Sequence, residues 1–145
     1  MTEIRFHFNV PDKLLYACRL LRKAYASGAR VAVTAEPAVL SELDQLLWSF
    51  SATDFVPHCR IGEAAGQTAG RSVLLVDSPA VCTHHSVLVN LGLNVPAEFE
   101  RFERFIEVVS DATDERLSGR IRWKHYMERG YSLQKYDVRS VDEAA

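Results

Sequence analysis

The sequence lacks the features of a membrane-spanning or secreted protein. It contains no apolar run of 18 residues, and its first residues, MTEIRFHF, do not have the pattern of a secretory signal peptide. Its three cysteines, Cys18, Cys59 and Cys82, are odd in number and widely spaced, which argues against the disulfide framework of a small secreted protein. We therefore expect a cytoplasmic protein with reduced thiols and no membrane contact.

The sequence is also poor in glycine and has no glycine-rich phosphate loop. The turn expected after the first strand reads Asn-Val-Pro-Asp, and no Gly-x-x-x-x-Gly-Lys-Ser/Thr motif follows anywhere. Gly62, Gly66 and Gly70 lie in a stretch of small residues that predicts a surface loop. No Gly-x-Ser-x-Gly elbow is present and no cysteine has a basic local context, so we expect neither a catalytic site nor a bound cofactor.

Histidine and cysteine occur together in two places without the spacing of a zinc site. One is His58 with Cys59, and the other is Cys82 with His84 and His85. Structural zinc sites usually contain two pairs of ligands, with two to four residues between the members of each pair. Adjacent side chains such as His58 and Cys59 point to opposite faces of a strand. We therefore predict buried cysteines and loop histidines instead of a metal site.

The length and composition are those of one globular domain. The chain has 145 residues, of which 48% are hydrophobic and 25% are charged, and this excludes a disordered, collagen-like or coiled-coil chain. We expect residues 1–139 to form a single domain and residues 140–145 to form a disordered C-terminal tail.

Strands and helices alternate along the first half of the chain. Ile4, Phe6 and Phe8 alternate with polar residues and predict a strand. Apolar residues then recur at helical spacing over 14–25, with Pro11 or Asp12 near the start and Gly28 placed to end the helix in a left-handed conformation. The other elements expected here are a strand at 30–34, a helix from Pro37 through Trp48, and an extended segment at 55–58 in which Pro57 indicates a sheet edge or a strand end.

The second half completes an α/β pattern. Continuous apolar runs at 73–76 and 87–91 are typical of strands covered on both faces. A helix is expected next from Pro96 through Val109; its inward residues would be Phe99, Phe102, Phe105 or Ile106, and its polar face would carry Glu98, Glu100, Glu103 and Glu107. A last helix would follow, capped by Asp111 or Thr113 and stopped by Gly130. The final element expected is an extended segment at 131–138. Together they predict a single-domain, three-layer α/β sandwich with a mostly parallel central sheet.

Positive charge is concentrated near the C-terminus. The net charge is −2, yet residues 116–139 contain seven cations and two anions. Arg116, Arg120 and Lys124 recur every fourth residue and share one helix face with Trp123 nearby. Paired guanidinium groups and an indole suit a peptide's C-terminal carboxylate and hydrophobic last residue. The alternatives are a solvated helix face, or single-stranded nucleic acid, which would use more aromatic residues along a longer groove.

A second cluster is aromatic and lies at 46–50 and 55–58. Helical phase places Leu43 and Leu47 on the core, but it cannot bury Trp48, Phe50 and Phe55 on that same face. These residues are either packed elsewhere in the core or exposed as a docking patch for a partner chain, for which tryptophan and phenylalanine are good anchors.

Taken together, these segments resemble the chi subunit of the bacterial DNA polymerase III holoenzyme. The resemblance runs in order from about residue 4 to 138. It rests on the segments 13–33, 43–50, 55–58, 88–91, 96–109, 120–126 and 129–133. It implies a non-catalytic α/β protein, Rossmann-like in shape without a phosphate-binding loop, that belongs to the clamp-loader assembly of the replisome.

In that family, chi tethers the clamp loader to single-stranded-DNA-binding protein by holding that protein's acidic C-terminal tail, which ends in a phenylalanine carboxylate. The matching tail-binding residues here are Arg116, Arg120, Trp123, Lys124, Gly130 and Tyr131. Arg120 corresponds to the principal carboxylate-binding arginine. Trp123 stands where the family usually has tyrosine and removes its hydroxyl.

The resemblance also implies a second contact surface, for the psi subunit and in some members for a helicase-like repair protein. The matching residues are Trp48, Phe50, Phe55, Val56 and Pro57. The protein would then contact DNA only indirectly and would be a monomer or weak dimer in isolation. Two other functions stay open: direct binding of single-stranded nucleic acid by the basic helix, and a degenerate nucleotide-binding enzyme.

Overall fold

In the part of the chain that this computed structural model describes, the central sheet has seven strands, and every pairing between them is parallel. The structure describes residues 2–49, 56–61, 73–79, 82 and 85–139. The strands are β1 (Glu3–Val10), β2 (Val31–Thr34), β3 (His58–Ile61), β4 (Val73–Val76), β5 (Val87–Asn90), β6 (Arg104–Ser110) and β7 (Leu133–Asp137). The helices with described bounds are α1 (Lys13–Ala26), α2 (Pro37–Ser49) and α3 (Thr113–Glu128), together with a short 3-10 helix, η2 (Phe99–Arg101).

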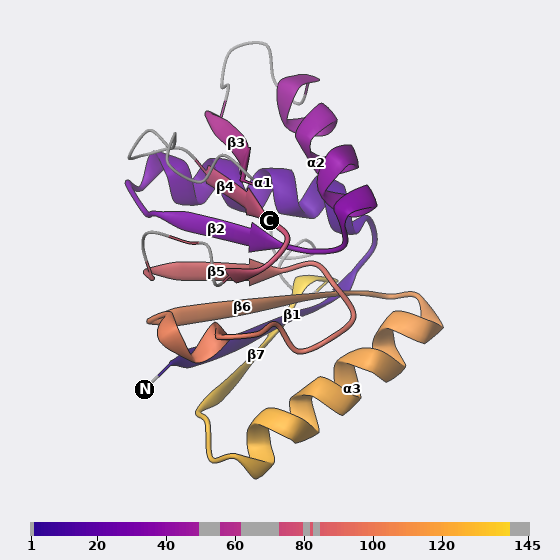
Figure 1. The fold of residues 1–145 in the computed structure, drawn as a ribbon. Coiled ribbons are helices and arrows are strands. Elements are labelled where there is room, and N and C mark those ends of the chain that lie inside the picture. The colour runs from indigo at the N-terminus through magenta and orange to yellow at the C-terminus, as the bar shows by residue number, and fades with distance from the viewer. Residues whose placement is uncertain (1, 50–55, 62–72, 80–81, 83–84, 140–145) are drawn as a thin grey trace.

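The strand order is β3-β4-β2-β5-β6-β1-β7, and the helices divide between the two faces of this sheet (Figure 1). After β1 the chain moves toward the β3 edge through α1 and α2, and from β4 onward it returns toward the β7 edge and passes through α3. Because parallel crossovers are right-handed, opposite directions of travel place the helices on opposite faces. The predicted three-layer α/β sandwich with a parallel sheet is therefore confirmed.

Each face of the sheet carries its own apolar core. Leu21 of α1 and Leu43 of α2 pack on Val33 and neighbouring strand residues on one face. On the other face, Tyr126 of α3 packs with Phe105 and with residues near η2. Both cores are closed to solvent, so β2, β4 and β5 are buried throughout or nearly so.

Several local predictions are confirmed. The Asp12 side chain caps α1 by accepting a hydrogen bond from the Leu15 amide at 3.1 Å. Gly28 and Gly130 follow α1 and α3 with φ of 83° and 82°, the left-handed conformation that favours glycine. Strand β3 begins directly after Pro57 and lies at the sheet edge. Cys18 and Cys82 are buried, and burial raises the pKa of both thiols to about 11.

The predicted helix from Pro96 through Val109 is wrong. This segment forms the single turn η2 and then β6, which lies between β5 and β1. Its apolar residues match a helical period, but β6 is covered on both faces, with Phe105 and Val109 in one core and Ile106 and Val108 in the other. Pairing with two neighbouring strands outweighs that local pattern. Glu107, predicted on the polar face of that helix, is completely buried.

The predicted cap of the last helix is also wrong. Ala112 occupies the N-cap position of α3 and makes no side-chain cap, and Thr113 is already the first helical residue. Glu115 instead accepts a hydrogen bond from the Ser110 amide at 3.2 Å. An acidic side chain in the first turn also suits the positive end of the helix dipole.

Some predictions fall outside the described residues: the loop containing Gly62, Gly66 and Gly70, and the tail at 140–145. The helices within the described ranges include none with the length and apolar character needed to cross a membrane.

Candidate functional site

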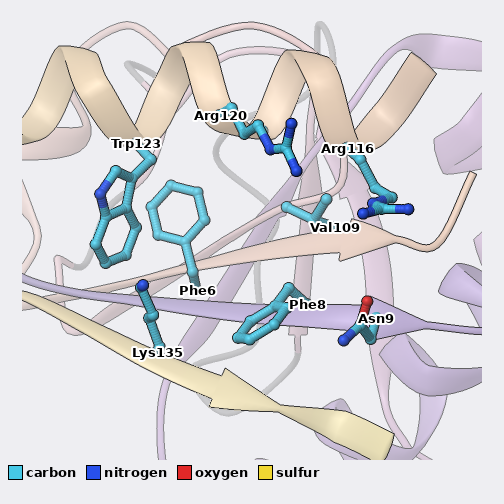
Figure 2. Close-up of a pocket in the computed structure, with 9 residues that line it drawn as sticks. Phe6, Phe8, Asn9, Val109, Arg116, Arg120, Trp123 and Lys135 are labelled. Carbon is cyan, nitrogen blue, oxygen red and sulfur yellow. The ribbon is translucent and has the colours of Figure 1, made fainter. Parts of the chain in front are cut away.

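A pocket of about 370 Å³ lies between α3 and the strands β1, β6 and β7 (Figure 2). Its walls combine cationic and aromatic side chains. The lining residues are Phe6, Phe8, Asn9, Val109, Arg116, Gly119, Arg120, Trp123 and Lys135. This volume falls at the lower end of the range of small-ligand sites, which is roughly 300–1,000 Å³.

The floor of the pocket is apolar because of the side-chain alternation of β1. Phe6 and Phe8 are two residues apart and point to the same face of the sheet, toward α3 (Figure 2). The Phe6 ring meets Trp123 edge to face, with 5.0 Å between ring centroids. Val109 of β6 also lines the pocket. Such a floor suits a flat apolar group of a ligand.

The upper wall carries the positive charge. Arg116 and Arg120 lie one turn apart on α3, and Figure 2 shows both guanidinium groups directed toward β1. Neither guanidinium forms an ion pair or hydrogen bond within the described residues. Lys135 of β7 places its ammonium 5.2 Å from the centroid of the Trp123 ring. Because no described carboxylate lines the pocket, it favours an anion.

Gly119 allows α3 to lie close to the sheet at the centre of this pocket. A Cβ atom on Gly119 would stand 3.0 Å and 3.1 Å from the two Cγ atoms of Val109. Contacts of 3.0–3.4 Å are tighter than nine in ten real Cβ contacts, so a side chain at position 119 would require Val109 to shift by a few tenths of an ångström.

We predict that Gly119→Val lowers the free energy of unfolding by about 1–3 kcal/mol, since overpacking a dense contact has this cost. The helix propensity of valine is only slightly higher than that of glycine, so steric crowding determines the change in the free energy of unfolding. Urea denaturation measures it. Adding Val109→Ala to Gly119→Val removes the atoms that are crowded and should recover part of the lost stability. Met127→Val, at an exposed position of α3, is the control for introducing valine into this helix. A Gly119→Val protein as stable as the parent would contradict the prediction.

A buried polar network holds α3 against the sheet beside the pocket. Glu107 accepts hydrogen bonds from Arg122 Nε at 3.0 Å, the Tyr126 hydroxyl at 2.6 Å and Asn90 Nδ2 at 2.9 Å. Arg122 Nη1 also donates to the Leu93 carbonyl at 2.8 Å. Burial raises the pKa of Glu107, and the charge and hydrogen bonds of its partners oppose that rise. Burial, with the nearby carboxylate, also raises the pKa of Tyr126.

This network changes the interpretation of the basic C-terminal region. The sequence count included Arg122, whose side chain is 3% exposed and paired with Glu107. Six of the seven cations therefore remain at the surface, since Arg116, Arg120, Lys124, Arg129, Lys135 and Arg139 are all exposed.

The structure brings together part of the predicted tail-binding set. Arg116, Arg120 and Trp123 line the pocket, whereas Lys124 lies on the outer side of α3, 4.0 Å from Glu128. Gly130 ends the helix. Tyr131 packs against the Phe99 ring, with centroids 5.4 Å apart. Neither Gly130 nor Tyr131 lines the pocket.

Sequence reasoning missed the residues that the sheet contributes to the pocket. These are Phe6, Phe8, Asn9, Val109 and Lys135. The alternation of Phe6 and Phe8 showed that they share a face, and only the crossover that places α3 over β1 shows which helix they meet. A glycine in the middle of α3, Gly119, was the available signal of a close approach.

The second predicted surface lies at the end of α2, on the sheet face opposite the pocket. Trp48 is 64% exposed, and its ring meets His58 with centroids 5.3 Å apart. Pro57 is half-buried, and Val56 is buried in the core beneath them. Phe50 and Phe55 lie outside the described residues.

No described group of three or more His, Cys, Asp or Glu side chains is arranged to hold a metal ion. His84 and the side chain of Cys59 lie outside the described residues. His58 instead engages protein groups: its Nε2 is 3.0 Å from Asp44 Oδ1, and its Nδ1 is 2.7 Å from the Val56 carbonyl oxygen.

Comparison with known proteins identifies the family of this chain. The family model described as "DNA polymerase III chi subunit, HolC" matches residues 1–134. The chain belongs to the chi subunit family of DNA polymerase III. A protein of Pseudomonas aeruginosa named DNA polymerase III subunit chi is 36% identical over 142 residues, which cover 94% of this chain and 96% of the relative. One of the same name from Haemophilus influenzae is 26% identical over 123 residues, covering 84% and 85%.

Family membership confirms the resemblance stated from the sequence and places the chain among accessory subunits of the replicative polymerase. Near the end of β1, Asn9 has a positive φ of 60°, and the residues between β1 and α1, Pro11 and Asp12, include no glycine of a phosphate loop.

Proposed function

We propose that this chi-family protein captures the acidic C-terminal tail of single-stranded-DNA-binding protein and joins it to the clamp loader through a psi-type subunit. One observation carries the proposal. Two guanidinium groups without a partner in the described residues, Arg116 and Arg120, lie above an apolar floor built from Phe6 and Phe8. A peptide that ends in a phenylalanine carboxylate matches both halves of this pocket.

The chemistry of capture follows from the two halves. The terminal carboxylate would accept charge-assisted hydrogen bonds from Arg120 and Arg116. The terminal phenyl ring would lie against Phe6, Phe8 and Val109, where its burial is favourable. Acidic residues upstream in the tail would be attracted by Lys135 and the exposed cations of α3 across solvent. A short peptide buries little surface, so we expect micromolar affinity that falls as salt rises.

The position of Trp48 supports the proposed link to a psi-type subunit. Its exposed indole lies at the end of α2, on the opposite face of the sheet from the tail pocket. Exposed tryptophan is a frequent anchor of protein interfaces. A partner held there would leave the tail pocket open, as a tether between two assemblies requires.

Fluorescence anisotropy of a labelled acidic peptide ending in Asp-Phe tests the capture site. We expect binding to weaken at least tenfold when the peptide C-terminus is amidated, because the amide removes the anionic group that the arginines bind. Arg120→Ala should weaken binding of the free-acid peptide by a similar factor. Arg19→Ala, an exposed arginine on α1, is the matched control and should leave the affinity unchanged.

Two outcomes would overturn the proposal. One is equal affinity for the free and amidated peptides. The other is failure of the peptide to bind at low salt while a single-stranded oligonucleotide binds, which would assign the basic helix to direct nucleic-acid binding with its steep salt dependence.

A further inference from the structure

The outward face of α3 exposes apolar side chains that the tail pocket does not use. Leu117 and Ile121 are 54% and 72% exposed. Leu93, 40% exposed, lies beside another side of α3, because its carbonyl accepts hydrogen bonds from Ser118 Oγ at 2.7 Å and from Arg122 Nη1 at 2.8 Å. Among the described residues, these three make up half of the large apolar side chains exposed to solvent.

Helical spacing places two charges in line with this apolar pair. Asp114, Leu117, Ile121 and Lys124 follow one another at intervals of three, four and three residues, so they form a single stripe along α3. All four are exposed. The stripe is different from the one formed by Arg116, Arg120 and Trp123, which faces the pocket.

The stripe is complementary to itself when a second copy is turned antiparallel. With the two-fold axis at the level of Gly119, Leu117 of one copy lies opposite Ile121 of the other, and Asp114 lies opposite Lys124. Each apolar contact and each opposite-charge pair then occurs twice, as a closed two-fold interface requires. We propose that α3 pairs with α3 of a second copy of this chain through this face.

The pairing is weak and keeps both pockets accessible. The two apolar side chains that α3 of each copy contributes bury far less than the roughly 1,200 Å² at the low end of stable complexes, so the dimer forms only at high concentration. A two-fold axis perpendicular to both helices leaves the two pockets on the same side of the pair. Such a dimer would present two anion sites to one multivalent ligand.

Sedimentation equilibrium of the full chain over a wide concentration range tests the pairing, with charge reversal as the specific probe. We expect the average mass to rise from the 16.3 kDa monomer toward twice that value. Asp114→Lys or Lys124→Asp alone places like charges opposite each other twice, and each should weaken dimerisation at least tenfold. The double variant restores opposite charges and should recover the dimer. Ile121→Ser should abolish it.

Charge reversals on other helices show whether the effect is specific to the α3 face or follows from any change of surface charge. Glu42→Lys on α2 and Lys23→Asp on α1 are exposed and should leave self-association unchanged. Circular dichroism verifies that each variant is folded. A monomeric mass at every concentration, a dimer insensitive to the single reversals, or a double variant no better than the singles would each overturn the proposal.

Discussion

Replacing Arg122 with methionine is expected to lower the free energy of unfolding by about 3–5 kcal/mol at pH 7, because it leaves a buried carboxylate without its counter-charge. Arg122 and Glu107 have side chains that are 3% and 0% exposed, with Arg122 Nε 3.0 Å from the carboxylate. Tyr126 and Asn90 still donate to Glu107 in the variant, but neither carries a charge. Chemical denaturation measures the loss.

Two companion variants identify the cause of the Arg122 effect. Arg122→Met with Glu107→Gln removes both charges and should recover at least half of the loss, since the buried group is then neutral. Arg129→Met, just beyond the end of α3, removes an exposed cation and should change stability by less than about 0.5 kcal/mol. If the single and double variants are equally unstable, lost packing accounts for the effect.

The Arg122→Met effect should also depend on pH. Burial raises the pKa of Glu107 in the native chain, and loss of the arginine charge raises it further. A carboxyl group with a raised pKa in the folded state takes up its proton at a pH where the unfolded chain does not. The difference between variant and parent should therefore shrink as the pH falls from 7 toward 5.

Acidification from pH 7 to pH 4 should destabilise the fold by roughly 3 kcal/mol through His7 alone. His7 is 7% exposed, and its Nδ1 shares a hydrogen bond with the Tyr16 hydroxyl. The centroid of its ring lies 4.8 Å from the centroid of the Tyr136 ring. Burial, with a smaller effect of Arg5, lowers the pKa of His7 from 6.5 to about 4. The unfolded chain thus binds the proton first, and stability present above pH 6.5 is lost as pH falls toward 4.

Comparing pH profiles of two variants isolates the His7 contribution. Glutamine at position 7 does not bind a proton in this range, so the free energy of unfolding of His7→Gln should fall by roughly 3 kcal/mol less than that of the parent over the same interval. His125→Gln, on α3, is the control for the loss of an imidazole elsewhere in the fold. A His7→Gln profile parallel to the parent's would refute the assignment.

Local sequence pattern was sufficient for most elements and failed where distant pairing decides the structure. The alternation of Ile4, Phe6 and Phe8 predicted β1, and Gly28 marked the end of α1. The prediction for segment 104–110 was wrong, because a central strand that is buried on both faces carries apolar residues without a period of two. Its glutamate could be understood only with Arg122, which lies on another element.

The candidate site was predictable from α3 and not from the sheet. The four-residue spacing of Arg116, Arg120 and Lys124 identified a basic helix face, but it could not fix how the helix is rotated. Gly119 and Arg122, which anchor α3 to β6, set that rotation. As a result Trp123 faces the pocket and Lys124 faces outward.

The place of β1 in the sheet has a consequence for the order in which the molecule is built. β1 lies between β6 and β7, whose residues come much later in the chain. The pocket accordingly takes its floor from Phe6 and Phe8 and its wall from Arg116, Arg120 and Lys135. Contacts between residues so distant along the chain form slowly, because the entropy of closing a long loop is lost before the contacts contribute any stability. A chain shortened before α3 therefore has no cationic wall at this pocket, and anion binding there reports that α3 and β7 have joined β1.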